Sequence, residues 1–108
     1  MTDAQTLAHQ AAALTVLARL AVQFPTLPSA YLVSSDVTPL RVGVQLNHVE
    51  ALESWREALH IAADKVAIRS HSTDGRMSLG FPGDVEGIAF DVYVVFELAA
   101  PQKQEATA

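Results

Sequence analysis

Hydrophobic and polar residues recur along the chain with periods that predict two helices. Segment 3–24 is rich in alanine and leucine and contains neither glycine nor proline, so its helix propensity is high. A 3.6-residue period puts Val16 and Val22 near or within its polar side. The same period places an apolar arc on the opposite side, made of Leu7, Leu14, Leu17, Leu20, Ala21 and Phe24. Pro25 ends this helix.

The second helix is predicted from residue 47 to about residues 60–63. A set of apolar residues recurs at spacings of three and four, which places the indole on the buried stripe: Val49, Leu52, Trp55, Leu59 and Ala62. Glu50, Glu53 and Glu57 fall on the side that faces water. We therefore expect Trp55 to belong to the core.

Five shorter segments, 30–37, 40–46, 65–72, 77–81 and 87–98, are typical of strands. In 40–46 the residues Leu40, Val42, Val44 and Leu46 alternate inward, and in 87–98 the even-numbered positions from Ile88 form an apolar face. Asp74-Gly75 and the segment 82–84, Pro-Gly-Asp, are predicted to be hairpin turns. Gly43 and Gly80, each inside a strand, indicate a bulge or the close approach of another backbone.

The predicted order is α-β-β-α-β-β-β, and most links between strands are as short as hairpins. This pattern predicts an α+β fold: a two-layer sandwich of a mainly antiparallel five-stranded sheet with both helices on one face. Residues 1–98 are expected to form a single domain, and residues 99–108 a flexible C-terminal tail because their periodicity is lost.

Composition and charge narrow the functional classes. The chain has 108 residues, of which 50% are hydrophobic, so it can bury a core without a metal or a disulfide, and it has no cysteine. Seven basic and twelve acidic residues give a net charge of −5, and the basic residues are scattered. Direct nucleic-acid binding and membrane binding are therefore not expected, and no window is long and apolar enough to span a membrane. We expect a cytoplasmic protein with no cofactor and no metal.

Two arrangements could carry catalysis, and each has a simpler explanation. His60 and Asp64 could form a base and its partner at a helix end, but His60 could equally interact with the last helical carbonyls. Ser34, Ser35 and Asp36 could join His71 in a nucleophilic triad, but hydroxyls and an acid before Thr38-Pro39 are also ordinary turn chemistry. We prefer the structural reading in both cases and predict no catalytic residue.

Two surfaces are candidates for binding a partner. The sheet face away from the helices is expected to carry Arg69, His71, Asp91, Tyr93 and Glu97, a mixture that suits a protein contact as well as ordinary solvation. The acidic row of the second helix, residues Glu50, Glu53 and Glu57, is usually a solvated face and could alternatively dock a basic protein. The wide apolar arc of the first helix and the strand edges favour a homodimer.

The segments "LPSAYLVSSD" and "LRVGVQLNHVEALESWREALHI" place a strand hairpin before a helix with a Trp-Arg-Glu-Ala-Leu core, Trp55 to Leu59. Here the chain resembles small uncharacterised α+β proteins of actinobacteria and their mobile elements, over about a third of its length. The resemblance implies a cytoplasmic bacterial or phage setting and transfers no functional residue.

The hypothesis that best fits these observations is a non-enzymatic protein-interaction module that binds itself or another protein. One alternative is a small-molecule-binding protein or minor enzyme with a pocket between sheet and helices, near Tyr31, His71 and Tyr93. Another is an acidic inhibitor protein that mimics nucleic-acid charge, which would need acids clustered on one face.

Overall fold

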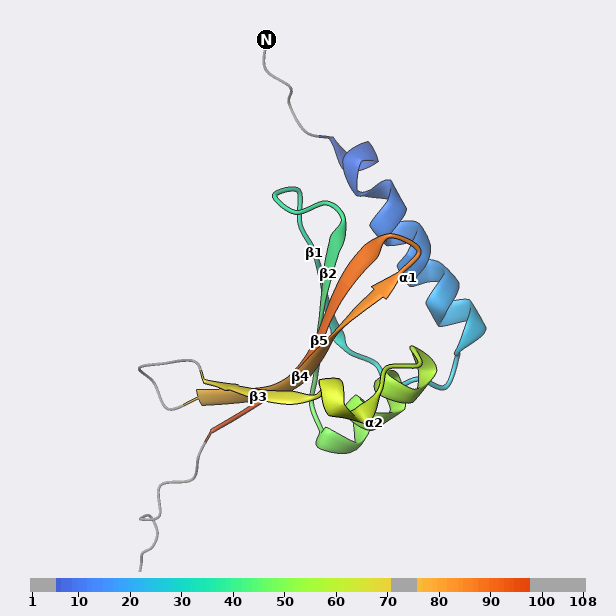
Figure 1. Cartoon of the computed structure of the whole chain (residues 1–108). Helices are drawn as coiled ribbons and strands as arrows, with labels where there is room; N and C mark the ends of the chain where they lie inside the picture. Colours follow the sequence, from blue (N-terminus) through green and yellow to red (C-terminus); the bar gives the residue numbers. More distant parts are fainter. Residues whose placement is uncertain (1–5, 71–75, 98–108) are drawn as a thin grey trace, which may run out of the picture.

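The computed structural model describes residues 6–70 and 76–97. Its elements in chain order are η1 (Leu7–Gln10), α1 (Ala11–Gln23), β1 (Tyr31–Ser34), β2 (Arg41–Leu46), α2 (Val49–Ala58), η2 (Ala63–Lys65), β3 (Ala67–Ser70), β4 (Arg76–Val85) and β5 (Ile88–Glu97), as Figure 1 shows. The predictions for His71, for the Asp74-Gly75 turn and for the tail 99–108 lie outside the described residues.

The five strands form one sheet in the order β1-β2-β5-β4-β3. Three of its pairings are antiparallel, and the central pair of β2 and β5 is parallel, with Val42 opposite Phe90 and Val44 opposite Val92. The predicted class, an α+β fold with a five-stranded and mainly antiparallel sheet, is confirmed.

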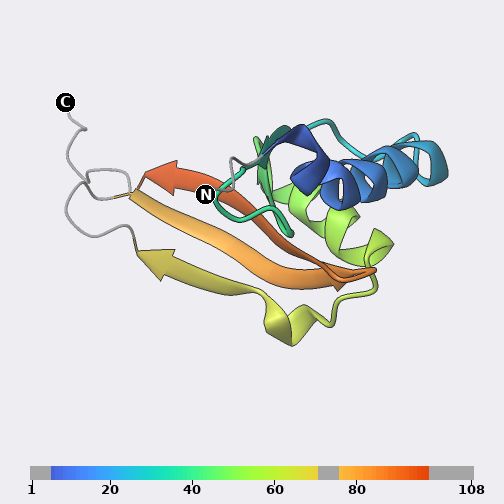
Figure 2. The ribbon, with the colours of Figure 1, turned by 90° about the horizontal axis from the view of Figure 1, so that it is seen from above.

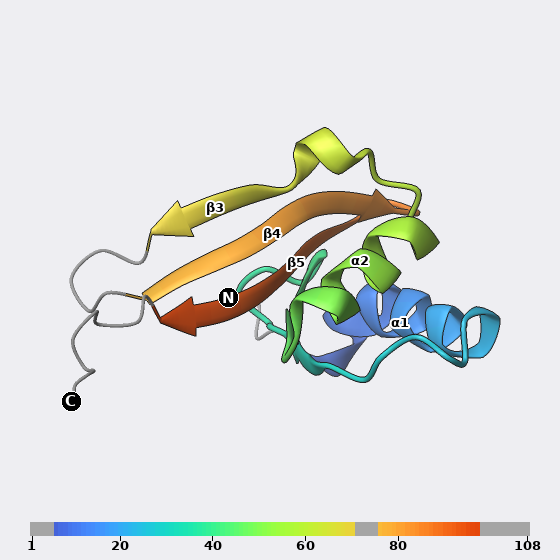
Figure 3. The same ribbon diagram turned by 90° about the horizontal axis from the view of Figure 1, so that it is seen from below.

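Both helices lie on the same side of the sheet, as Figures 2 and 3 show. The core between the layers contains most of the predicted inward residues of β2 and β5 and part of the predicted stripe of α2. Its members on these elements are Val42, Val44, Leu46, Ala51, Leu52, Trp55, Ile88, Phe90, Val92 and Val94. Leu59 and Phe96 are only partly buried, and the prediction that Val49 and Ala62 belong to the buried stripe is wrong, because Val49 lies at the exposed start of α2 and Ala62 lies beyond its end. Leu40 was predicted to point inward but is exposed, because β2 begins only at Arg41 and Leu40 lies in the preceding turn.

The apolar arc predicted for the first helix is only partly buried. Ala13, Val16 and Leu20 face the core, so the assignment of Val16 to the polar side is wrong, while Leu7 and Leu14 of the predicted arc are exposed. Among the leucines of the predicted arc, Leu20 is buried and Leu17 is partly buried against the core. The buried side of the helix is therefore narrower than the predicted arc.

The predicted turn at Pro82-Gly83-Asp84 is wrong, because these residues continue β4. Pro82 pairs with Asp91 of β5, and the pairing runs on to Val85 opposite Ile88. Among the described residues, β3 pairs with β4 from Met77 to Gly80, and no strand pairs with the other side of β4 at Pro82. The missing N–H of Pro82 therefore costs no hydrogen bond between strands. The turn is Glu86-Gly87, where φ values of 53° and 86° match a two-residue type I′ hairpin.

Candidate interaction surfaces

The sheet face away from the helices carries the predicted mixed set of side chains. The strand register places Tyr93 beside Gln45 and Gly80, and Asp91 beside Gly43 and Pro82, all with the parity opposite to that of the core residues of these strands. Glu97 shares this parity in β5 opposite Arg76, and nothing is described of its side chain. Tyr31 and Tyr93 therefore lie on the wrong face for the predicted pocket between sheet and helices.

The structure joins two residues of this face in an ion pair. The guanidinium Nη2 of Arg69 donates to Oδ1 of Asp91 at 3.0 Å, although β4 lies between their two strands. The side chain crosses β4 above Gly80, where a Cβ atom would come within 2.8 Å of that same nitrogen. Gly80 thus leaves the space that lets Arg69 reach Asp91, and the ion pair is formed within the face.

A shallow depression of about 230 Å³ lies beside this ion pair. Gly43 forms part of it, and its other lining residues are Val33, Thr38, Arg41, Val42, Asp91 and Tyr93. It is open to solvent and has room for a single side chain of a partner.

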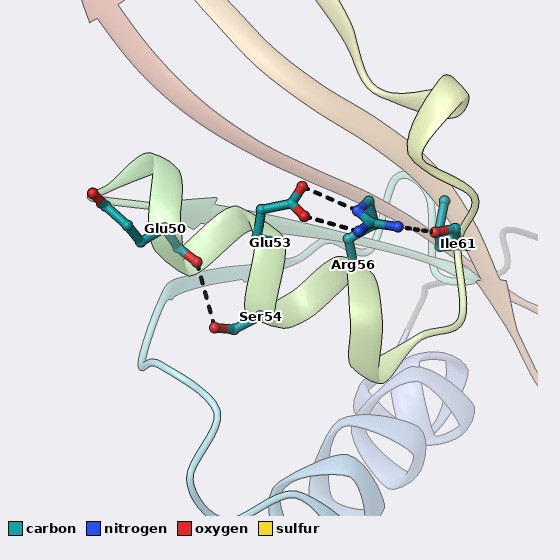
Figure 4. Close-up of polar contacts among 5 residues, drawn as sticks. All are labelled: Glu50, Glu53, Ser54, Arg56 and Ile61. Carbon is teal, nitrogen blue, oxygen red and sulfur yellow. Dashed lines mark hydrogen bonds and ion pairs between the residues drawn. The ribbon is translucent and has the colours of Figure 1, made fainter.

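On the acidic row of α2, Glu53 is held by a neighbouring arginine. Nε and Nη2 of Arg56 donate to the two carboxylate oxygens of Glu53 at 3.0 and 2.8 Å, and Nη1 donates to the carbonyl oxygen of Ile61 at 2.7 Å (Figure 4). The hydrogen bond from Arg56 lowers the pKa of Glu53, and the same bond raises the pKa of Arg56. Glu50 and Glu57 are exposed.

The end of α2 explains His60. The N–H of His60 donates to Glu57 at 3.1 Å and that of Ile61 to Arg56 at 3.0 Å, which together make a Schellman motif. His60 occupies its left-handed position with φ of 58°, where glycine is the usual residue. The ring of His60 is exposed and, among the described residues, hydrogen-bonds neither Asp64 nor the last helical carbonyls, so it is the backbone N–H of His60 that contacts those carbonyls.

The serine cluster also serves the backbone. Oγ of Ser35 accepts the N–H of Val37 at 3.1 Å, the turn chemistry expected of this segment. Oγ of Ser34 accepts from Nε2 of Gln10 at 2.8 Å, which fixes the start of α1 over the end of β1. Within residues 6–70 and 76–97, no three histidine, aspartate or glutamate side chains gather in a group that could hold a metal ion.

The strongest feature lies at the β1 edge of the sheet. β1 is an outermost strand, and three of its four residues expose large apolar side chains: Tyr31 is 68% exposed, Leu32 45% and Val33 40%. Tyr31 and Val33 point away from the helices, whereas Leu32, opposite the buried Val44, lies on the helical face. The edge is therefore apolar on both faces.

An apolar stripe of α1 continues this edge in the helical layer. Leu14 is exposed and stands four residues after Gln10, which contacts β1, and three before Leu17, which lines a groove beside Leu32. We call Leu14, Tyr31, Leu32, Val33 and this groove the β1-edge surface.

The groove has a volume of about 230 Å³ and lies between α1, the linker 24–30 and α2. Its lining residues are Leu17, Leu20, Ala21, Phe24, Pro25, Leu27, Pro28, Ser29, Ala30, Leu32 and Trp55, none of them charged. Nε1 of Trp55 donates to the carbonyl oxygen of Pro28 at 3.0 Å and so holds the linker against α2.

Sequence reasoning anticipated a surplus of apolar surface on the first helix but did not connect it with β1. The signal was present in the segment 30–33, Ala-Tyr-Leu-Val, which is apolar at consecutive positions although a strand exposed on one face should alternate. Such a run indicates that both faces of the strand meet apolar surroundings.

Comparison with known proteins identifies no family and no relative. No family model matches the chain, and no curated protein and no solved structure matches it with significance. No helix among the described residues is long and apolar enough to cross a membrane.

Proposed function

We propose that the protein is a non-enzymatic interaction module that self-associates through the β1-edge surface. The observation that carries this proposal is the outermost strand β1, which is apolar on both faces and adjoins an apolar groove. A contiguous apolar patch on a small protein marks an interaction site more often than a solvated surface.

The contrast between the two edges of the sheet supports this choice. An edge strand offers unpaired N–H and C=O groups, and proteins that stay monomeric protect such strands with charges or proline. β3, at the opposite edge, contains Arg69, whose guanidinium reaches across β4 to Asp91, and Lys65 ends a 3₁₀ turn two residues before β3 begins. β1 contains no charged residue and no proline, so no charge within it opposes pairing.

Sedimentation velocity from low to high micromolar concentration tests the proposal. We expect the wild-type protein to form a dimer as concentration rises, and Leu32→Lys to remain monomeric because a lysine on an edge strand opposes pairing. Ile68→Lys on β3 is the matched control, since Ile68 is also on an edge and 61% exposed, and it should behave as wild type. A wild-type protein that stays monomeric throughout would overturn the proposal.

A second candidate function is the binding of a small apolar molecule in the groove. The observation that favours it is the Trp55-lined apolar volume of about 230 Å³, not the region of Tyr31 and Tyr93 that the sequence suggested. In a thermal-shift screen, an apolar compound at 100 times its Kd should stabilise the protein by about 2.7 kcal/mol. Because the groove belongs to the β1-edge surface, such a ligand should also shift the dimer toward monomer, and no stabilising compound would leave this candidate without support.

A further inference from the structure

We infer that the two copies join their β1 strands antiparallel about a two-fold axis, with Leu32 of one copy directly opposite Leu32 of the other. This inference rests on the proposed self-association and adds its geometry. The two sheets become one continuous sheet, and the helices of both copies lie on the same side of it.

The two-fold axis restricts the register. In an antiparallel pair, residues that stand opposite each other point to the same face of the sheet. Leu32 lies on the helical face, and Tyr31 and Val33 lie on the other, so Leu32 cannot stand opposite Val33 of the second copy. Four registers centred within β1 remain, with Tyr31, Leu32, Val33 or Ser34 opposite its own counterpart. Centring on Ser34 is unfavourable because it puts Leu32 opposite the charged Asp36, which leaves three registers to compare.

The side chains distinguish these three registers. Centring on Leu32 pairs leucine with leucine on the helical face and Tyr31 with Val33 on the other, and aromatic with β-branched pairs are favourable across strands. Centring on Val33 puts Leu32 opposite Ser34, whose hydroxyl is engaged with Gln10. Centring on Tyr31 puts Leu32 opposite Ala30 and brings Pro28, which has no N–H to donate, into the paired segment. Centring on Leu32 alone pairs large apolar side chains on both faces.

Pairing about the same two-fold axis also buries the helical part of the β1-edge surface. Gln10 ties the start of α1 to the end of β1, and Leu17 and Ala21 line the groove together with Leu32. Arg19, on the other flank of the helix, pairs with Glu86 at the β4–β5 turn, so α1 lies between that turn and the β1 edge with one flank toward β1. Two-fold pairing of β1 therefore brings the two α1 helices toward each other with Leu14 between them. A second copy of the chain fits this surface because the two halves are alike. The apolar β1 of one copy contacts β1 of the other, and the exposed leucine side of α1 contacts its counterpart. No lining residue of the groove carries a charge that would be buried.

Single-cysteine variants test the register directly because the natural chain has no cysteine. Opposed residues in an antiparallel pair have Cα atoms about 4.5–5.5 Å apart, within the range of about 4.4–6.8 Å that a disulfide needs. Under mild oxidation we expect Leu32→Cys to form a covalent dimer with itself. A mixture of Tyr31→Cys with Val33→Cys should cross-link more than either variant alone, and Ile68→Cys on the opposite edge should stay monomeric on a non-reducing gel.

The outcomes separate the inference from the proposed function. If wild type sediments as a dimer but Val33→Cys or Tyr31→Cys cross-links with itself better than Leu32→Cys, the register is overturned and the proposed function stands. A dimer in which no β1 cysteine cross-links would overturn both, as would a monomeric wild type. Circular dichroism and sedimentation of each variant under reducing conditions show whether the substitution itself leaves folding and association intact. If Leu32→Cys does not fold, the mixture of Tyr31→Cys with Val33→Cys tests the register instead.

Discussion

Two glycines lie on the outer face of the sheet, and their surroundings differ. A Cβ atom on Gly80 would come within 2.5 Å of the carbonyl oxygen of Val92 and 2.8 Å of the Cβ atom of Tyr93. On Gly43 it would meet nothing nearer than the Cβ atom of Val33 at 3.6 Å, an ordinary contact distance. The sequence indicated a bulge or the close approach of another backbone at both glycines. The close approach is confirmed at Gly80, and Gly43 shows neither, because it pairs in unbroken register with Val33 and Asp91.

This difference predicts opposite effects of the same substitution. Gly80→Ala forces backbone atoms of β5 to move and displaces Arg69, so we expect a loss of about 1–3 kcal/mol of folding free energy, as overpacked sites show. Gly43→Ala, the matched control, should be neutral or stabilising by up to about 1 kcal/mol because alanine reduces the entropy of the unfolded chain. Urea unfolding measures both values, and equal losses in the two variants would contradict the assignment.

The C-terminal turn of α2 depends on one arginine that binds both a side chain and the backbone. Arg56 holds Glu53 and the carbonyl of Ile61, the residue at which the Schellman motif ends. Because the pKa of Glu53 is lowered below its ordinary value of 4.5 in the folded protein, this pair stabilises the fold above that value. The stabilisation is lost as pH falls through the lower, folded pKa.

Acid titration of stability tests this link. Below pH 4.5 the wild-type protein should lose unfolding free energy more steeply than Glu53→Gln, which has no carboxylate to protonate. The effect should be small because the glutamate side chain is 53% exposed. Glu50→Gln is the control, since Glu50 makes no ion pair with any residue of the described part of the chain, and it should follow the wild-type curve. Parallel acid curves for wild type and Glu53→Gln would contradict this role.

The chain's single tryptophan connects α2 with the linker that forms the groove. Trp55 is only 6% exposed and donates to Pro28, so we expect Trp55→Ala to cost about 3–5 kcal/mol in urea unfolding followed by circular dichroism. Trp55→Phe keeps an aromatic ring but leaves the Pro28 carbonyl without its donor, which should cost about 1–3 kcal/mol. A near-zero loss in the alanine variant would mean that the indole does not belong to the core.

Among the elements, those that depend on local periodicity were predictable and those that depend on distant pairing were not. The apolar stripe of α2 and the alternation in β2 predicted most of the buried residues of these elements. A helix or strand with one buried face has apolar residues at the period of that face. Pro82-Gly83-Asp84 has the composition of a turn, yet β5 pairs with it, while β3 leaves its other side open. The observed turn, Glu86-Gly87, has a weaker turn signal in the sequence. The pairing of β4 with β5, which a local pattern does not contain, determines which of the two segments forms the turn.

At the scale of the whole molecule, the parallel pairing of β2 with β5 was not foreseeable from the sequence. Local hairpin signals join strands that are neighbours in the chain, whereas β2 and β5 are separated by α2, β3 and β4. This pairing puts β1 at the edge of the sheet with β2 inside, and so it creates the β1-edge surface. The predicted outer-face set, by contrast, depended on strand parity alone, and Arg69, Asp91 and Tyr93 do share that face.

The net charge of the molecule predicts how salt affects self-association. Each copy carries a formal charge of −5, so two copies repel each other, while the strand and groove that meet are uncharged. Sodium chloride screens the repulsion, since the Debye length falls from about 10 Å at 0.1 M to about 3 Å at 1 M. The dimer Kd from sedimentation equilibrium should therefore fall severalfold as salt rises.

A double variant separates this repulsion from any specific contact by the acidic row. Glu50→Gln with Glu57→Gln removes two negative charges from α2, outside β1, and takes the formal charge from −5 to −3. It should associate more tightly than wild type at low salt and respond less to added salt, because less repulsion remains to be screened. If salt instead weakens the wild-type dimer and the double variant abolishes it, ion pairs of the acidic row hold the copies together and the apolar edge does not.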